Sequence, residues 1–324
     1  MATHSQGTFG KLIIEPSDTP AATGHTYVFD SSSIRIEFLY EDIALRRRII
    51  GKRRGIRGTL SRNAARGREG MRMVRGRIVT YLTPDVVDLL ADDVWGMSES
   101  PSGTFSLNET VPYFGIMIDR ETGIFQYDDC KVDYISIAAR TPQPGDRGEP
   151  ELVTLTMGII CAAAEATAGS WPSSEPGFIP TASDAPYTIF DTDTGVTLFG
   201  EVRATEEIRL TWRNFLAAKA VNSLNVHSLR PTDRQIAFYA KIPWNSTTQD
   251  IHTTAVAGAA GSVVFTNSAL STQFNFANLM QEIRSPTIRG KNQIFYEIFA
   301  EAACSGDPSD PTNLELQVIN DNTA

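Results

Sequence analysis

Apolar and polar residues alternate in many stretches of the chain, and this period is typical of β-strands with one buried face. Ile34–Phe38 alternates strictly near the start, and Ile208–Trp212 repeats the pattern in the second half. Similar runs predict further strands at Met71–Tyr81, Tyr113–Ile118, Gly123–Tyr127, Lys131–Ala139, Leu152–Ala162, Gln235–Pro243, Val263–Phe265, Leu270–Phe276, Ile294–Ala300 and Leu314–Ile319. The pattern therefore predicts a mainly β fold.

One short helix is predicted between residues 84 and 95. Thr83 suits the N-cap position, Pro84 suits the first helical position, and Asp85 suits the positive end of the helix dipole. An apolar face for packing is formed by Val86, Val87, Leu89, Leu90 and Val94. Gly96 follows as a natural stop. In the second half, Ala217–Val221 is too short to predict a matching helix.

The length of 324 residues is about right for two domains. The best boundary is the stretch 168–186, which holds four prolines and two glycines. The first 33 residues are rich in Ser, Thr, Gly and Pro and are typical of an N-terminal arm, although they include the apolar patch Leu12–Ile14. The predicted organisation is an arm at 1–33, a first domain at 34–167, a linker at 168–186 and a second domain at 187–324.

Positive charge is concentrated in one part of the chain, which is predicted to be a long basic loop at 46–71. Between Arg46 and Arg77 there are 13 basic residues and one acidic residue, Glu69, so this segment carries a charge of +12. The net charge of −9 then leaves −21 for the remainder. An acidic body with one basic segment fits recognition between identical subunits as readily as binding to nucleic acid.

Three interpretations of the basic loop follow from its residues. The first is a solvated loop with no specific partner, and the second is a contact with DNA phosphates. The loop has no interleaved aromatic residues for stacking on bases and no recognition-helix pattern, which speaks against DNA. The third is an assembly arm that reaches an acidic face of an identical subunit, and the charge distribution favours it.

Sequence motifs for catalysis, cofactors or metals are missing. The chain has no GxxxxGK[ST], HExxH or GxSxG motif, so no enzyme, cofactor or metal site is predicted. Cys130, Cys161 and Cys304 are widely spaced and are predicted to be buried thiols in a reducing compartment. The chain contains no run of about 20 apolar residues, so no membrane span is predicted. Residues 1–10 lack the apolar run of a signal peptide.

The order of these features resembles the tail tube proteins of long-tailed bacteriophages. In the first half, the resemblance is carried by a strand entering a long charged loop and by Gly-x-Arg-Gly-Thr around Ile56–Thr59, followed by Gly76–Val79 and Thr83–Asp85. In the second half, it is carried by Ile208–Trp212, Phe265–Asn267 and Pro286–Lys291. The resemblance covers the chain from about residue 10.

The resemblance implies two tandem β-sandwich or half-barrel domains with a short flanking helix. In this family, subunits form rings whose inner sheets join into a barrel, and the rings stack into a hollow tube that conducts DNA to the host. Rings of single-domain subunits use six copies, so two domains per chain imply three chains in a ring. The lumens of such tubes tend to be acidic, which keeps DNA sliding.

The long loop of the family reaches the adjacent ring. The resemblance therefore assigns ring-to-ring contacts to Arg46, Arg47, Arg48, Lys52, Arg53, Arg54, Arg57 and Arg62. The implied partners are other copies of the chain, a tape-measure protein, tail-end capping proteins and duplex DNA passing without sequence-specific binding. The implied location is the virion tail, with assembly in the host cytoplasm. Two alternatives stay open: a DNA-binding β protein that uses residues 46–77, and another virion component such as a capsid decoration protein.

Overall fold

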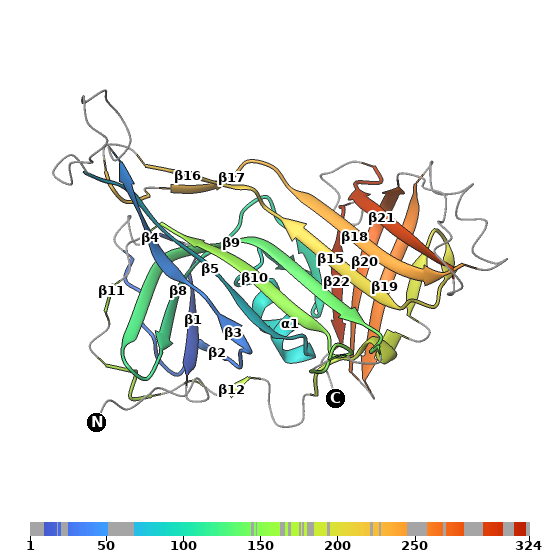
Figure 1. The fold of residues 1–324 in the computed structure, drawn as a ribbon, viewed down its shortest axis with the longest axis horizontal. Helices are drawn as coiled ribbons and strands as arrows, with labels where there is room; N and C mark the ends of the chain where they lie inside the picture. Colours follow the sequence, from blue (N-terminus) through green and yellow to red (C-terminus); the bar gives the residue numbers. More distant parts are fainter. Residues whose placement is uncertain are drawn as a thin grey trace, which may run out of the picture.

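The computed structural model describes residues 10–17, 19–20, 25–50, 68–143, 146, 148–162, 166–167, 170–174, 176, 178–179, 185–192, 195–220, 223–226, 228–244, 258–267, 270–281, 294–306 and 314–321. These residues form β-strands almost throughout, with one α-helix and one short 3-10 helix in the described part (Figure 1). The mainly β fold predicted from the alternating pattern is therefore confirmed.

Eleven strands and the helix precede residue 168. Their bounds are β1 (Lys11–Ser17), β2 (Ile34–Ile36), β3 (Tyr40–Glu41), β4 (Ala44–Ile50), β5 (Arg68–Tyr81), α1 (Pro84–Ala91), β6 (Met97–Glu99), β7 (Thr104–Leu107), β8 (Tyr113–Asp119), β9 (Ile124–Arg140), β10 (Thr154–Cys161) and β11 (Ala166–Thr167).

The remaining elements follow in the same way. Their bounds are β12 (Phe178–Ile179), the 3-10 helix at Ile189–Thr192, β13 (Val196–Leu198), β14 (Glu201–Val202), β15 (Glu207–Arg213), β16 (Leu216–Lys219), β17 (Ser228–Pro231), β18 (Gln235–Pro243), β19 (Ala259–Asn267), β20 (Leu270–Gln281), β21 (Phe295–Ala303) and β22 (Gln317–Asp321).

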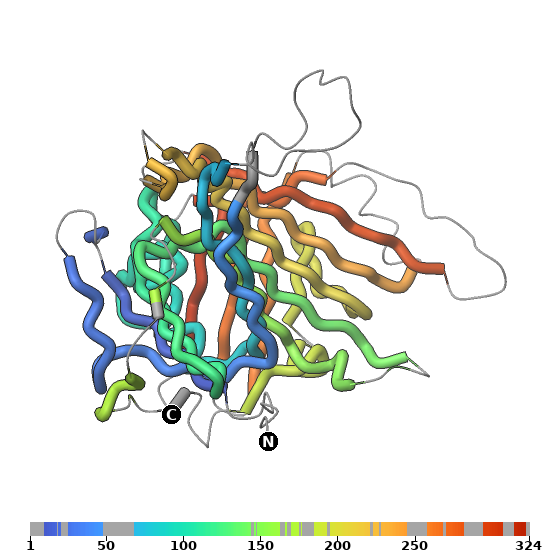
Figure 2. Tube along the Cα trace, turned by 60° about the vertical axis from the view of Figure 1, so that its left-hand side comes forward, coloured from blue at the N-terminus to red at the C-terminus, as the bar shows by residue number. Residues whose placement is uncertain are grey.

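A central sheet runs through both halves of the molecule. Its antiparallel order is β4–β5–β10–β9–β15–β18–β21. The halves meet where β9 pairs with β15, with Ile137 opposite Leu210. Figure 2 shows the strands of the second half continuing the row that begins with β9 and β10. The sequence separation of these partners explains why no local pattern could predict the join.

A second layer of strands packs against one face of the central sheet, and it also mixes the two halves. In the second half, the order is β13–β19–β20–β22, and β22 continues into β7 of the first half. Buried aromatic residues between the layers include Phe238, Phe265, Phe274 and Phe276. A single core cluster contains residues of both halves. The division into two tandem tube domains stays a prediction, because strands of both halves share these layers.

Strand β9 is one long element where the sequence pattern predicted two. Asp128 and Asp129 fall between the two predicted strands, Gly123–Tyr127 and Lys131–Ala139, but lie within β9. Asp129 has a positive φ of 52°, and the pairing with β8 shifts register between Phe114 and Ile116. This β-bulge bends the strand, so that its first part pairs with β8 and its second part joins the central sheet. The Asp129 carboxylate is buried and accepts a 3.1 Å hydrogen bond from the Tyr27 hydroxyl.

The described parts of the N-terminal stretch and of the predicted basic loop include β-strands that composition did not suggest. Strand β1 pairs with β8 along its whole length, and Leu12, Ile13 and Ile14 are fully buried. The predicted loop of 46–71 is strand at both of its ends, because β4 extends to Ile50 and β5 begins at Arg68. Pairing between these two ends satisfies backbone groups that a loop would leave to water.

The helix begins where predicted but ends early. The Thr83 hydroxyl accepts the N–H of Val86 at 3.2 Å, which confirms the N-cap. The helix ends at Ala91 rather than near residue 95. The N–H of Val94 donates to the carbonyl of Leu90 as in an α-helix, but the N–H of Trp95 donates to the same carbonyl, so the chain turns away from the helical path there. Residues 216–219, which overlap the weak helical run at Ala217–Val221, form strand β16. No helix in the described part of the chain has the length and apolar character that a membrane crossing requires.

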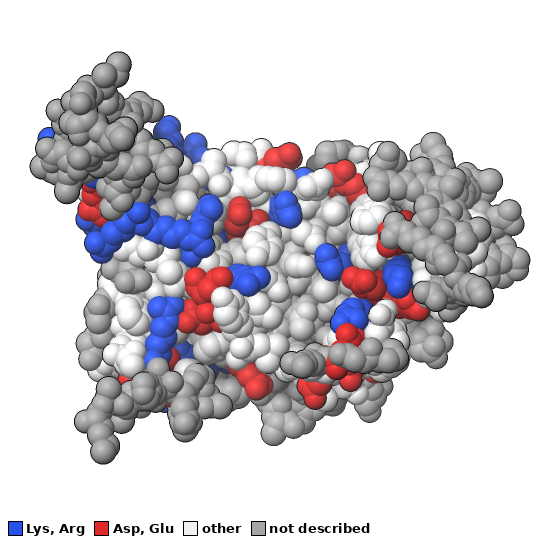
Figure 3. Space-filling view, viewed as in Figure 1, with Lys and Arg blue, Asp and Glu red and all other residues white. Residues whose placement is uncertain are grey.

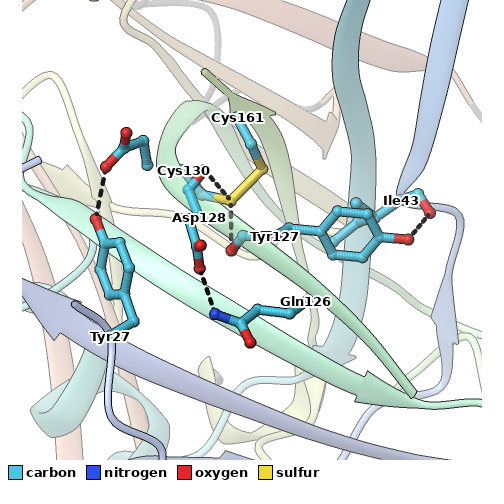
Figure 4. The surroundings of a disulfide bond; sticks show 8 residues. Tyr27, Ile43, Gln126, Tyr127, Asp128, Cys130 and Cys161 are labelled. Atoms are coloured by element: carbon cyan, nitrogen blue, oxygen red, sulfur yellow. Dashed lines mark hydrogen bonds between the residues drawn. A yellow bond between two sulfur atoms is a disulfide. The ribbon is translucent and has the colours of Figure 1, made fainter. Parts of the chain in front are cut away.

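The prediction of three buried thiols is wrong. Cys130 on β9 and Cys161 on β10 lie opposite each other in the sheet and form a disulfide (Figure 4). Cys304 is a free thiol and is partly exposed. The two bonded cysteines are 31 positions apart in sequence and become neighbours only through strand pairing.

Candidate assembly surfaces

The two ends of the basic segment lie in β4 and β5, which pair with each other as an antiparallel hairpin. We call this feature the basic hairpin. Arg46 lies opposite Met73, and Arg47 lies opposite Arg72. In Figure 1, the two strands run together to the upper left of the molecule, away from the second layer. Arg46 and Arg47 are therefore placed by the structure, and Arg48 is placed only as part of the β4 backbone. The other predicted contact residues lie outside the described residues: Lys52, Arg53, Arg54, Arg57 and Arg62.

The two faces of the hairpin differ in charge balance. On one face, the Glu69 carboxylate lies 2.8 Å from Arg72 Nε and 3.8 Å from Arg47 Nε. The hydrogen bond from Arg72 lowers the pKa of Glu69. Because neighbouring strand residues point to opposite faces, Arg46 projects away from this acid. The one acidic residue of the segment thus neutralises only one side of the hairpin.

A ribbon from the second half of the chain supports the root of this hairpin. Strands β16 and β17 pair with each other, and the N–H of Arg72 donates to the carbonyl of Leu224, which precedes β17, at 2.6 Å. The Asp133 carboxylate accepts the N–H of Leu216 at 2.8 Å. A small apolar cluster lies beneath the ribbon and contains Ile160, Ala162, Val226 and Leu229, with Met73, Leu216 and Ala218 at its margin. No signal in the sequence linked residues 216–231 to the hairpin.

The face of the central sheet opposite the core carries small neutral side chains across its middle. One cross-strand row contains Val79, Thr156, Ser136, Thr211 and Ala237. A row further along the same face alternates in charge and contains Arg140, Glu207, Lys241 and Glu297. Figure 3 shows a largely uncharged centre, with a band of basic side chains at the upper left. This face is therefore balanced in charge rather than acidic.

The central sheet ends with β4 on one side and β21 on the other. Strand β4 pairs with β5, and its opposite edge faces no strand that the structure describes. Strand β21 continues into pairing with β20 only at Ala300–Ala303. An edge of this kind presents backbone N–H and carbonyl groups that can pair with a strand of another chain.

Within the described residues, no group of three or more His, Cys, Asp or Glu side chains is arranged to hold a metal ion. The candidate assembly surfaces are the basic hairpin, the uncovered sheet face and the sheet edges.

Comparison with known proteins identifies a family. A family model described as "Phage tail tube protein" matches residues 18–308, which is most of the chain. A search of curated proteins found no matching relative.

Proposed function

The chain belongs to the phage tail tube protein family, and from this premise we propose that its copies form rings that stack into a hollow tube conducting DNA from capsid to host. Membership of the family makes it a structural component of the virion tail. The observation that carries the proposal is the central sheet, which crosses both halves, ends in strand edges and leaves one face uncovered. A sheet with these properties can be continued from one chain to the next.

Ring closure would join the β4 edge of one copy to the β21 side of the next. Closing the circle removes the edges that otherwise favour aggregation. Three copies of the seven strands in the central sheet would contribute roughly 21 strands, whereas barrels of 16–18 strands already leave an aqueous channel. Both halves supply strands to this sheet, which supports two places in the ring for each chain and hence three chains.

Stacking of rings would use the basic hairpin. The segment from Arg46 to Arg77 carries +12 and the rest of the chain carries −21, so the arm of one ring is attracted to the body of the next. A contact between two different surfaces of identical subunits generates an open filament when the rotation between successive copies does not close, as it would between stacked rings. Arg46 and Arg47 lie at the described base of this arm, and the contact would continue through Lys52, Arg53, Arg54, Arg57 and Arg62.

The proposed partners follow from the tube. A tape-measure protein would occupy the lumen during assembly in the host cytoplasm, and capping proteins would close the tail ends. Duplex DNA would pass along the uncovered sheet face, whose middle row of small side chains offers no base-specific hydrogen-bonding pattern.

Electron microscopy of the purified full-length chain tests the proposal. We expect hollow tubes, and a helical reconstruction with three copies of the chain in each ring. Particles that stay single at high protein concentration would contradict polymerisation. Six copies in each ring would overturn the two-places-per-chain arrangement while leaving the tube itself intact.

Charge reversal tests the arm separately. Changing Arg53, Arg54 and Arg57 to Glu should block tube elongation without unfolding the subunit, because repulsion replaces attraction. The matched control reverses Arg140, Arg209 and Arg213 on the uncovered sheet face, which changes the total charge equally. Normal tubes from a folded arm variant, or equal loss of elongation in both variants, would reject the arm as the stacking contact.

A further inference from the structure

A groove of about 250 Å³ lies at the root of the basic hairpin, on the uncovered face of the central sheet. The charged residues that line it are Arg46, Arg75, Arg77, Asp42 and Asp133. Arg46 and Arg75 share this face because Arg46 lies opposite Met73, two positions before Arg75 on β5. We call this feature the root groove.

The two carboxylates of the root groove are already engaged. Asp42 lies 3.5 Å from Arg77 Nε and also accepts the backbone N–H of Arg77 at 2.7 Å. Asp133 accepts the backbone N–H of Leu216 at 2.8 Å. Neither Arg46 nor Arg75 forms an ion pair with a carboxylate in the part of the chain that the structure describes. Arg46 and Arg75 therefore have no direct carboxylate partner among the described residues, and the charged side chains that line the groove carry a net charge of +1.

Arg75 also carries a hydrogen-bond donor without a protein acceptor. Its Nε is buried and has no partner among the described residues, and its Nη2 lies 4.0 Å from the sulfur of Met73. A buried donor that lacks an acceptor is destabilising, and an anionic oxygen placed in the groove would remove this penalty. This observation is independent of the charge count and points to the same kind of ligand.

The groove continues along one row of the sheet toward another arginine. Arg77, Gly158, Tyr134 and Arg213 lie side by side on β5, β10, β9 and β15. The Tyr134 ring covers Gly158 so closely that any Cβ there would overlap it. A second hollow, lined by Asp133, Tyr134, Arg213 and Phe215, shares two of its residues with the root groove. The basic face is therefore extended rather than a single point.

We propose that the root groove binds phosphate groups of a nucleic-acid backbone through Arg46 and Arg75. The planar guanidinium group presents paired N–H donors that match two phosphate oxygens, and contacts of this kind carry no sequence preference. The inference rests on the proposed function in one respect, since the tube places duplex DNA along this sheet face. Passage of DNA would then include one attractive contact on a face that is otherwise neutral or balanced in charge.

The test measures binding of a fluorescently labelled 20-base-pair duplex to the unassembled full-length chain as salt is raised from 50 to 200 mM. The groove variant is Arg46→Gln/Arg75→Gln. The matched control is Arg140→Gln/Arg209→Gln, which removes two charges from the same face at sites paired with Asp146 and Glu207. We expect the groove variant to reduce the slope of log K against log salt by roughly two, and the control to leave it unchanged.

A third variant, Arg75→Lys, keeps the charge and should keep the slope. Equal slopes in wild type and groove variant, or equal losses in the groove and control variants, would overturn the proposal. Binding of poly-glutamate that depends on the groove, with duplex binding unaffected, would assign the groove to an acidic protein segment and also overturn it. Imaging of the same samples keeps the two hypotheses apart, because tubes without groove-dependent duplex binding reject only the groove, and duplex binding without tubes rejects only the tube.

Discussion

The backbone N–H of Arg72 donates a 2.6 Å hydrogen bond to the carbonyl of Leu224. Arg72 belongs to the basic hairpin of the first half, and Leu224 belongs to the connection between β16 and β17 in the second half. A parallel bridge between Arg72 and Asn225 extends this contact. The direction in which the hairpin leaves the body is therefore set by residues more than 140 positions further along the chain.

The ribbon should control local stability of the hairpin root. Leu229 is 1% exposed in the small cluster under the ribbon, so Leu229→Ala should cost at least about 2 kcal/mol in local stability. Hydrogen exchange at the Arg72 amide should then accelerate by roughly 30-fold, with little change in the main core. The control, Leu279→Ala, opens a cavity in the main core instead and should lower global stability. Unchanged exchange at Arg72 in Leu229→Ala would contradict the bracing role.

A partly buried ion pair should stabilise the first half. Arg120 binds both oxygens of Glu41, at 2.7 and 2.8 Å, and the Glu41 side chain is only 10% exposed. Glu41→Gln removes the charge that faces Arg120 and should lower the free energy of unfolding by about 2 kcal/mol. In contrast, Glu207→Gln removes an exposed pair with Arg209 and should cost less than about 0.5 kcal/mol. Urea denaturation at pH 7 measures both, and similar losses would argue against a special role for the buried pair.

Lys131 should make stability depend on pH in the alkaline range. It is 6% exposed, and its ammonium lies 3.8 Å from the centre of the Tyr113 ring. Burial lowers the pKa of Lys131 from 10.5 to about 8. Between these values the unfolded chain keeps a proton that the folded chain has lost, so the contribution of Lys131 to folding stability rises with pH.

Replacement of Lys131 by Met tests this sign. At pH 7, the lysine is charged in both states and its burial is unfavourable, so the Met variant should be more stable than wild type. The difference in unfolding free energy between the two proteins should shrink as pH rises from 8 toward 10.5. A difference that stays constant over this range would show that Lys131 does not titrate as expected.

The disulfide should stabilise the pair β9–β10. Cys130 and Cys161 are 31 positions apart, and linking them restricts the unfolded chain by about 2–4 kcal/mol. Reduction should therefore lower stability by this amount, while Cys130→Ala/Cys161→Ala should not respond to reductant. Thiol labelling of the native protein, read by mass spectrometry, should modify Cys304 first. Labelling of all three cysteines before reduction would show that the bond is absent.

Local features of the fold were predictable from sequence because each depends on neighbours within a few positions. The alternating pattern placed β18 at Gln235–Pro243, with both ends as observed. The Thr83–Pro84 start of α1 was predictable for the same reason, because a cap requires only residues within one turn. The early end of α1 was not, because it depends on Trp95, whose N–H shares the Leu90 carbonyl with that of Val94 and whose side chain is buried in the core.

Pairing between distant strands was decided by tertiary structure alone. An alternating pattern shows that a stretch is a strand, but it does not identify the strand with which that stretch pairs. The join of β9 to β15 and the pairing of β7 with β22 were therefore invisible in the sequence. The disulfide and the bulge at Asp129 follow from the same pairings, because they appear only once β9 lies between β8 and β10.

For the basic segment, the sequence by itself determined the amount of charge, and the fold determined where it is exposed. The count of +12 between Arg46 and Arg77 needs no structure. Which arginines are neutralised depends on cross-strand position, since Glu69 lies beside Arg47 and Arg72 on one face of the hairpin. Arg46 and Arg75 lie on the other face, where Asp42 and Asp133 are held by Arg77 and by the backbone of the ribbon. Charge is a property of composition, whereas charge compensation requires the few ångströms of proximity that only strand pairing provides.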